Sequence, residues 1–310
     1  MIELSIVIPI FNESKNIKKL VNEIIANLPT KKKCEIIFVD DGSNDDSSLI
    51  LYELKKKINN FKFLSLNKNY GQSTALHAGI SNAEGKYVIT MDGDLQNDPR
   101  DIKIFYEYII ANKLDCVFGW RKHRKEKYFF RKVISKIANI IIKKILNNSI
   151  NDLGCSFKCF RREIFDQIIW STDFHRYFSA FIVNEGFKTE ELIVNHKKRN
   201  AGKSKYGYSR VFGVFIDIIF LSFVFKSLRK PLHFFGKFSL ILLFFSFLCA
   251  MLAIYYKLFG IKKFTETPLP ELITLLTLSS IIILFFGILS ELILSLYFHL
   301  KGKRDYVTKK

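Results

Sequence analysis

The sequence predicts an α/β domain with a mainly parallel sheet, followed by amphipathic helices and a hairpin of two transmembrane helices. Apolar strands alternate with helical patterns over the first 120 residues. Clusters of polar residues follow three of these strands, and two long segments near the C-terminus contain no charged residue. Alternation of strands and helices is typical of a parallel sheet that has helices on both faces.

The strands are predicted from short apolar runs and the helices from apolar residues at helical spacing. The first strand is expected at residues 4–10, and Ser14 is placed to cap a helix whose apolar face includes Ile17 and Leu20. Pro99 is placed to open a later helix in its first turn. Further strands are expected at 35–39, 61–66, 86–91 and 115–119, with a strand-like segment at 156–160, and further helices at 47–58 and 72–82.

Charge and apolar residues are separated along the chain. Of the 310 residues, 49% are hydrophobic and 25% are charged. Residues 1–209 have the mixed composition of a folded domain, whereas Phe, Leu and Ile dominate from Val211 onward. The net charge of +19 indicates an anionic bilayer or a phosphorylated substrate as partner. Nucleic acid is not expected, because the sequence contains no nucleic-acid-binding motif.

The C-terminal third predicts a membrane anchor. Residues 238–256 and 272–290 are uncharged, and each matches the roughly 20 residues that a spanning helix needs. We therefore expect an interfacial amphipathic helix at 210–230, two transmembrane helices within 231–300 and a basic cytosolic tail at 301–310. The connection between the spans carries few positive charges, which places both chain ends in the cytosol.

Two further features concern the first domain. The basic amphipathic stretch at 127–147 is either a surface helix of the domain or a helix lying on the membrane, and both interpretations stay open. Five cysteines follow no signal peptide, so we expect reduced thiols in the cytosol. We interpret Cys155 and Cys159 as packing residues, because two cysteines alone are weak evidence of a metal site.

The polar clusters predict a binding site at the carboxyl ends of the strands, where open α/β sheets bind their ligands. The clusters are Pro9–Glu13, Asp40–Ser43 and Asp92–Gln96. Asp92 and Asp94 flank Gly93, and paired carboxylates of this kind suit Mg²⁺ or Mn²⁺ that also binds substrate phosphates. A Walker A motif, a G-x-G-x-x-G fingerprint and a serine nucleophile elbow are all absent from the sequence.

Two of these clusters, together with the residues that flank them, resemble the motifs of a known family. Val39–Ser43 and Met91–Gln96 resemble glycosyltransferase family 2. Members of this family have the Rossmann-like GT-A fold, and their reaction inverts the configuration of the sugar's anomeric carbon. The chain looks most like its polyprenyl-phosphate branch, the dolichol-phosphate mannose synthases and bactoprenol glucosyltransferases. The resemblance covers residues 3–232. It is supported by Ile8–Glu13, Asn69–Gln72, Phe118–Arg121 and Arg199–Tyr206. Phe11 departs from the tyrosine that the family often has, which removes a hydroxyl contact to the base.

The resemblance implies a role for each matching residue. The nucleotide sugar would be held by Pro9, Phe11, Glu13, Asp40, Asp41, Asp92 and Gly93. The metal would be held by Asp92, Asp94 and Gln96. The phosphates of donor and acceptor would be bound by Arg121, Arg199, Ser204 and Lys205. Asp152 and Asp94 are the expected catalytic residues, and Asp152 either accepts a proton or orients other groups.

These expectations describe a metal-dependent hexosyltransferase in the inner (plasma) membrane, multi-pass, with a cytoplasmic catalytic domain. Its donor would be a nucleotide sugar, with a uridine-diphosphate sugar preferred, and its acceptor a polyprenyl phosphate such as undecaprenyl phosphate. A membrane-bound family 2 transferase acting on a glycan or another non-lipid acceptor is the alternative. A catalytically inactive scaffold is disfavoured by the intact Asp92, Asp94 and Gln96. The sugar, the lipid length and any homo-oligomer stay open.

Overall fold

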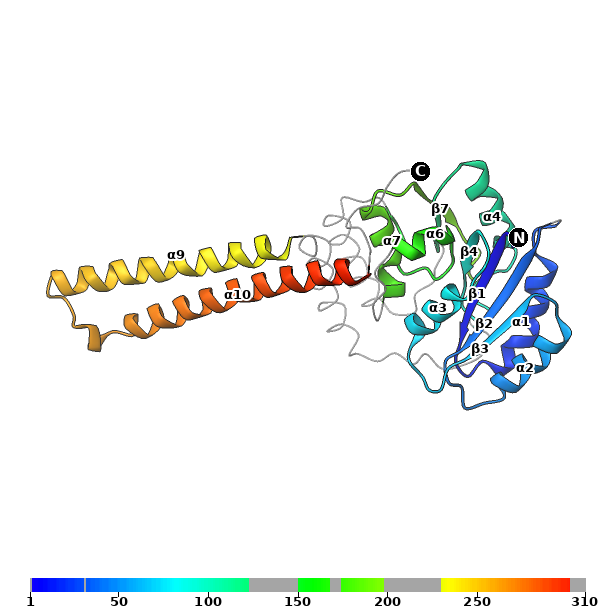
Figure 1. Ribbon diagram of the computed structural model, residues 1–310, viewed down its shortest axis with the longest axis horizontal. Helices are drawn as coiled ribbons and strands as arrows, with labels where there is room; N and C mark the ends of the chain where they lie inside the picture. The colour runs from blue at the N-terminus through cyan, green and yellow to red at the C-terminus, as the bar shows by residue number, and fades with distance from the viewer. Residues whose placement is uncertain (1, 31, 123–149, 168–173, 198–229, 302–310) are drawn as a thin grey trace. The chain divides into compact units, whose positions relative to one another are not determined.

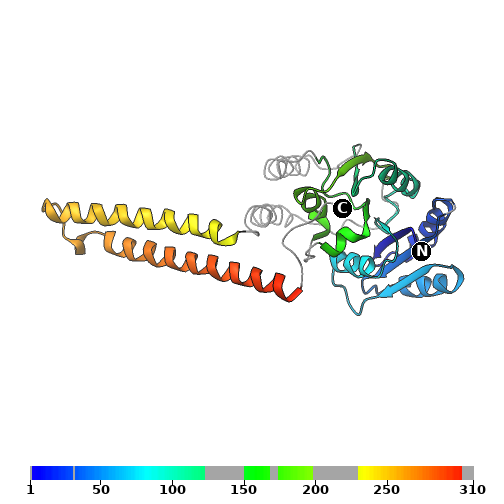
Figure 2. The same ribbon diagram turned by 45° about the horizontal axis from the view of Figure 1, so that its top comes forward.

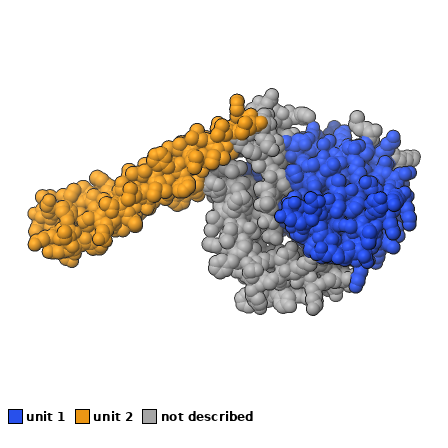
Figure 3. Space-filling view, turned by 60° about the horizontal axis from the view of Figure 1, so that its bottom comes forward, with its two compact units in different colours: residues 1–215 blue, residues 216–310 orange. Residues whose placement is uncertain are grey.

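A computed structural model describes residues 2–30, 32–122, 150–167, 174–197 and 230–301. The chain divides into two compact units, Met1–Phe215 and Ile216–Lys310 (Figure 3). The amphipathic stretch expected at 127–147, almost all of the interfacial helix expected at 210–230, and the basic tail from 302 onward lie outside the described residues.

The first unit is built on a seven-stranded sheet with the strand order β3-β2-β1-β4-β6-β5-β7 (Figure 1). The strands are β1 (Leu4–Ile10), β2 (Cys34–Asp40), β3 (Phe61–Ser65), β4 (Tyr87–Thr90), β5 (Cys116–Trp120), β6 (Lys158–Arg161) and β7 (Thr189–Ile193). The helices are α1 (Ser14–Ala26), α2 (Ser47–Lys57), α3 (Gln72–Ser81), α4 (Asp101–Ala111), α6 (Arg162–Gln167) and α7 (Phe174–Asn184).

Strand direction changes on one side of the sheet. Strands β1 to β4 are mutually parallel, as predicted. Strand β6 lies antiparallel between β4 and β5, and β7 runs parallel to β5. The fold is therefore a mainly parallel sheet with one reversed strand. Helices α6 and α7 and strand β7 have no counterpart in the prediction from sequence.

The central strands are mostly apolar because helices cover both faces of the sheet. All seven residues of β1 and all seven of β2 are buried. In the β1–β2 register Ile10 pairs with Asp40, so both strands end at the same edge. The loop after β4 reaches this edge too, since a Cβ added to Gly93 would lie 2.6 Å from Ile10 Cγ2.

Two local predictions at helix starts were wrong. Ser14 is the first helical residue of α1, after Glu13 in the capping position, and its amide donates to Asp45 Oδ2 at 3.1 Å. Helix α4 begins at Asp101 after Arg100, so Pro99 precedes its first turn. The cysteines at 155 and 159 are buried and unbridged, as expected of packing residues.

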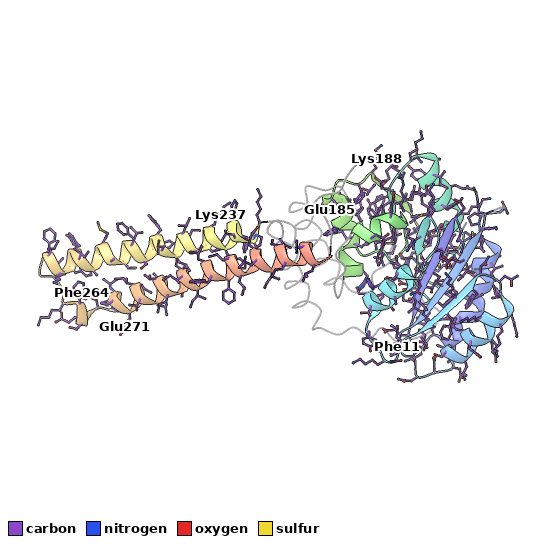
Figure 4. The ribbon with its side chains drawn as sticks, viewed as in Figure 1. Phe11, Glu185, Lys188, Lys237, Phe264 and Glu271 are labelled. Carbon is purple, nitrogen blue, oxygen red and sulfur yellow. The ribbon has the colours of Figure 1, made fainter. Side chains whose placement is uncertain are left out.

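The second unit is a helical hairpin. Helices α9 (Pro231–Leu258) and α10 (Leu269–Lys301) are joined through a short 3₁₀ turn, Phe264–Glu266. They lie side by side in both orientations of the ribbon (Figures 1 and 2). Both are long and apolar enough to span a membrane, and only 17% and 11% of their apolar windows are buried. Figure 4 shows Lys237 on α9, with Phe264 and Glu271 where the two helices join.

Hydroxyl groups hold the two helices together. Ser239 Oγ lies 2.9 Å from Ser280 Oγ, and Ser246 Oγ lies 2.8 Å from Thr277 Oγ1. Small polar residues at a contact between apolar helices allow close approach and form hydrogen bonds that lipid cannot supply. The hairpin thus has a specific internal interface, whereas its outer surface is apolar.

Candidate active site

The loops after β1 and β2 are tied together at the carboxyl edge of the sheet. Asn12, which has a φ of 57°, receives a hydrogen bond on Oδ1 from the Asn44 amide at 2.8 Å, and its own amide donates to Ser43 Oγ at 2.8 Å. Phe11 and Glu13 flank Asn12 and are half-buried, whereas Pro9 is buried within β1. Figure 4 shows Phe11 near the end of the sheet where β1 finishes.

Asp40 and Asp41 are both buried and both make hydrogen bonds within the protein. Asp40 accepts bonds from the Ser43 amide at 3.1 Å and from the hydroxyls of Ser43 and Ser48. The two oxygens of Asp41 accept the amides of Tyr70 and Gly71 at 2.7 and 2.8 Å. These carboxylates shape the loops around the expected nucleoside site. Their direct contact with a nucleoside stays a prediction.

The loop after β4 exposes every second residue. Asp92, Asp94 and Gln96 are half-buried, whereas Gly93, Leu95 and Asn97 are buried. Leu95 has a φ of 62°, and the Gln96 amide donates to Asp94 Oδ1 at 3.1 Å. The three expected metal ligands are therefore accessible, while the residues between them are buried.

The Asp92 carboxylate is held by donors from two distant segments. Gln72 Nε2 donates to Oδ1 at 2.8 Å, and Ser156 Oγ donates to Oδ2 at 2.6 Å. Asn97 Oδ1 accepts the Asp92 amide at 3.1 Å. Prediction from sequence assigned no role to Gln72, Ser156 or Asn97. Only the Asn69–Gln72 family pattern pointed toward Gln72.

Arg121 and Asp152 form a largely buried ion pair. Burial alone would raise the pKa of Asp152, but hydrogen bonds and charge from Arg121 outweigh it and hold that pKa below its usual value. Burial would lower the pKa of Arg121, but Asp152 and the nearby Cys155 and Asp92 raise it. Arg121 therefore stays positively charged within electrostatic reach of Asp92.

Lys158 is a second buried cation in this region. It lies on β6, it is 4% exposed, and its Nζ donates to the carbonyl oxygen of Cys155. Burial lowers its pKa.

The remaining expected phosphate-binding residues, Arg199, Ser204 and Lys205, lie outside the described residues. The segment just before them is attached to the acidic loop. The Lys197 amide donates to Gln96 O at 2.8 Å, and Asn195 donates to both oxygens of Asp101 at 2.9 and 3.0 Å. The structure thus brings residues 195–197 beside the loop that contains Asp94.

The residues at this edge fit a hard divalent cation that is coordinated partly by protein carboxylates and partly by the oxygens of a diphosphate. Within the part of the chain that the structure describes, no three His, Cys, Asp or Glu side chains converge on one point. An ion bound here would take one or two carboxylates, from Asp92 and Asp94, and complete its shell with other oxygens. Mg²⁺ and Mn²⁺ suit such a donor set, and zinc does not.

The mainly parallel sheet, the acidic loop after β4 and the loops after β1 and β2 define a GT-A glycosyltransferase. The chain belongs to glycosyl transferase family 2, whose family model matches residues 5–169. Among solved structures, mannosyl-3-phosphoglycerate synthase from Rubrobacter xylanophilus aligns with a TM-score of 0.55 at 14% identity, covering 72% of this chain and 74% of that chain. This likeness confirms the fold.

Two bacterial relatives are similar over most of their length. A dodecaprenyl-phosphate galacturonate synthase from Rhizobium johnstonii is 35% identical over 322 residues, covering 100% of this chain and 93% of the relative. An undecaprenyl-phosphate 4-deoxy-4-formamido-L-arabinose transferase from Pectobacterium atrosepticum is 30% identical, covering 99% of this chain and 93% of the relative.

A further solved structure has the same fold. The mannosyltransferase from Pyrobaculum calidifontis, solved with GDP-mannose and Mn²⁺, aligns with a TM-score of 0.53 at 15% identity over 73% of this chain and 64% of that chain.

Proposed function

We propose that this glycosyltransferase moves a sugar, with inversion, from a nucleotide sugar to a polyprenyl phosphate at the cytoplasmic face of the membrane. We expect this donor to be a uridine-diphosphate sugar. One observation carries the proposal: a single chain joins the Asp92–Gln96 loop to a hairpin of two membrane-length helices. The two relatives that span nearly the whole chain support it, because both are named for polyprenyl-phosphate acceptors.

On the donor side, Asp92, Asp94 and Gln96 would hold Mg²⁺ or Mn²⁺, and the loops around Phe11, Asp40 and Asp41 would surround the nucleoside. When bound, the cation neutralises charge on the departing diphosphate. The half-buried side chains of the acidic loop support this assignment, because they are both exposed to a ligand and held in position.

On the acceptor side, no general base is required. A phosphate monoester has a second pKa near 6, so its oxygen is already nucleophilic at neutral pH. Asp152 forms an ion pair with Arg121, so it would orient the Arg121 guanidinium toward a substrate phosphate. The remaining catalysis is alignment of the acceptor oxygen with the anomeric carbon, opposite the leaving diphosphate.

The anchor belongs to the same proposal. Helices α9 and α10 would cross the inner membrane twice and leave the catalytic unit in the cytoplasm. The charge distribution supports this orientation, because the connection between the two helices has only Lys262 and Lys263 as basic residues.

The test uses the full chain in membranes, with a radiolabelled nucleotide sugar and undecaprenyl phosphate. We expect label in the organic phase, no label without the lipid, and none with Asp92→Asn. Label that stays in water on a glycan would support the non-lipid acceptor instead. Parallel reactions with uridine and guanosine nucleotides, each carrying different sugars, would identify the donor.

A further inference from the structure

We propose that Gln72 is a positioning residue that sets the orientation of the Asp92 carboxylate for the metal. This inference rests on the proposed metal site and extends it. The Gln72 amide donates to Asp92 Oδ1 at 2.8 Å, while the Ser156 hydroxyl donates to Oδ2 at 2.6 Å. The carboxylate is therefore held from both sides, by α3 and by the segment before β6.

Gln72 is itself held at a defined place. It is the first residue of α3, and Gly71 before it has a φ of 95° that favours glycine. Both oxygens of Asp41 accept amides from Tyr70 and Gly71. The start of α3 is thereby attached to the end of β2.

The loop before α3 is packed as well as hydrogen-bonded. A Cβ added to Gly42 would lie 2.4 Å from the backbone carbon of Lys68. The backbone leading to Gln72 is fixed on this side, so the Gln72 side chain extends toward Asp92 from a rigid backbone position. A side chain can restrict the rotation of another only if its own backbone is held in place.

Holding both oxygens has a chemical consequence. Each carboxylate oxygen has two lone pairs, so one donor per oxygen leaves acceptor capacity for a cation. Outer hydrogen bonds of this kind orient metal ligands, and their loss typically weakens metal affinity by roughly 10–100-fold. A glutamine that only stabilised the fold would leave metal affinity unchanged when replaced.

The experiment measures Mn²⁺ binding directly, from the electron paramagnetic resonance of free Mn²⁺, on full-length protein in detergent with UDP at fixed concentration. Gln72→Met keeps the length of the side chain and removes the donor, and Gln72→Ala removes both. We expect both variants to bind Mn²⁺ roughly 10–100-fold more weakly than the wild type. Excess Mn²⁺ should restore most of the lost kcat.

Thr74→Ala is the matched control. Its hydroxyl donates to the carbonyl oxygen of Tyr70, just before α3, at 3.3 Å. It should leave Mn²⁺ affinity unchanged. The inference is overturned if Gln72→Met binds Mn²⁺ as tightly as the wild type, or if Thr74→Ala loses the same affinity.

The outcomes separate this inference from the proposed function. Mn²⁺ binding needs no lipid, so weakened binding in the Gln72 variants supports the inference even if lipid never becomes labelled. Wild-type protein that binds no Mn²⁺ in the presence of UDP would overturn the metal site, and the role of Gln72 with it.

Discussion

Arg121 and Asp152 are joined by two parallel hydrogen bonds, with Nε 2.7 Å from Oδ2 and Nη2 2.8 Å from Oδ1. Their side chains are only 12% and 18% exposed. Asp152 Oδ2 also accepts the backbone amide of Arg121 at 3.2 Å, and Glu191 accepts the Asp152 amide at 3.1 Å. Both oxygens of the Asp152 carboxylate thus accept hydrogen bonds from Arg121. This pairing bears on whether Asp152 can act as a general base.

The first prediction concerns the pH dependence of catalysis. The pKa of Asp152 lies below its usual 3.8, so the group stays ionised across neutral pH. We expect Asp152→Asn to lower kcat/KM by a similar factor from pH 6 to pH 9, because Arg121 loses its orientation. A wild-type acid limb that disappears in Asp152→Asn would show instead that Asp152 accepts a proton.

The second prediction concerns the stability of the same pair. Removing one member of a buried ion pair leaves the other uncompensated, which costs roughly 3–5 kcal/mol. We expect Asp152→Asn to lower the unfolding free energy by about this amount in detergent. Combining Asp152→Leu with Arg121→Met should cost less than the sum of the two single changes. Additive losses would argue against direct coupling.

The third prediction concerns the metal. Asp92→Asn and Asp94→Asn should each lower kcat/KM by at least about 100-fold, because a bound cation supplies several kcal/mol of charge stabilisation to the leaving group. The fold should be unaffected, and circular dichroism checks this. EDTA should inactivate the wild type, and added Mn²⁺ should restore it. Full activity in EDTA would refute metal dependence.

The fourth prediction concerns topology. A cysteine at Thr267, beside the 3₁₀ turn, should react with a membrane-impermeant thiol reagent applied to intact cells. Leu49 is 66% exposed on the catalytic unit, so Leu49→Cys is the matched control and should react only after permeabilisation. The unmodified chain gives the background, because four of its five cysteines are buried. The reverse pattern would invert the topology.

The fifth prediction concerns acid stability. Burial raises the pKa of Asp98, but hydrogen bonds from Arg100 and the pairing with Lys197 outweigh it and lower that pKa to about 2. A lowered folded-state pKa stabilises the protein above the unfolded value near 4, and this contribution is lost as the pH falls toward 2. The wild type should therefore lose about 2 kcal/mol more than Asp98→Asn between pH 5 and pH 2. Equal losses in the two proteins would contradict this.

Much of the fold could be predicted because its signals are local. Strands β1 and β2 are buried on both faces, so each contains an unbroken apolar run, Ile6–Ile10 and Ile36–Val39, that stands out in the sequence. Helices α9 and α10 stand out for a similar reason, since a spanning segment must avoid charge over about 20 residues. Strand β7, whose residues are all intermediate or exposed, lacks such a signal and was missed.

The sequence by itself determined the alternating strands and helices, the membrane-length segments and the Asp92–Gln96 loop, because each depends on residues close together in the chain. Only the tertiary structure decided that β6 enters the sheet antiparallel, and that Arg121 pairs with Asp152 and Gln72 with Asp92. Sequence predicts which side chains can donate or accept. Which donor meets which acceptor depends on how distant strands and loops pack, and that packing is set by the free energy of the whole fold.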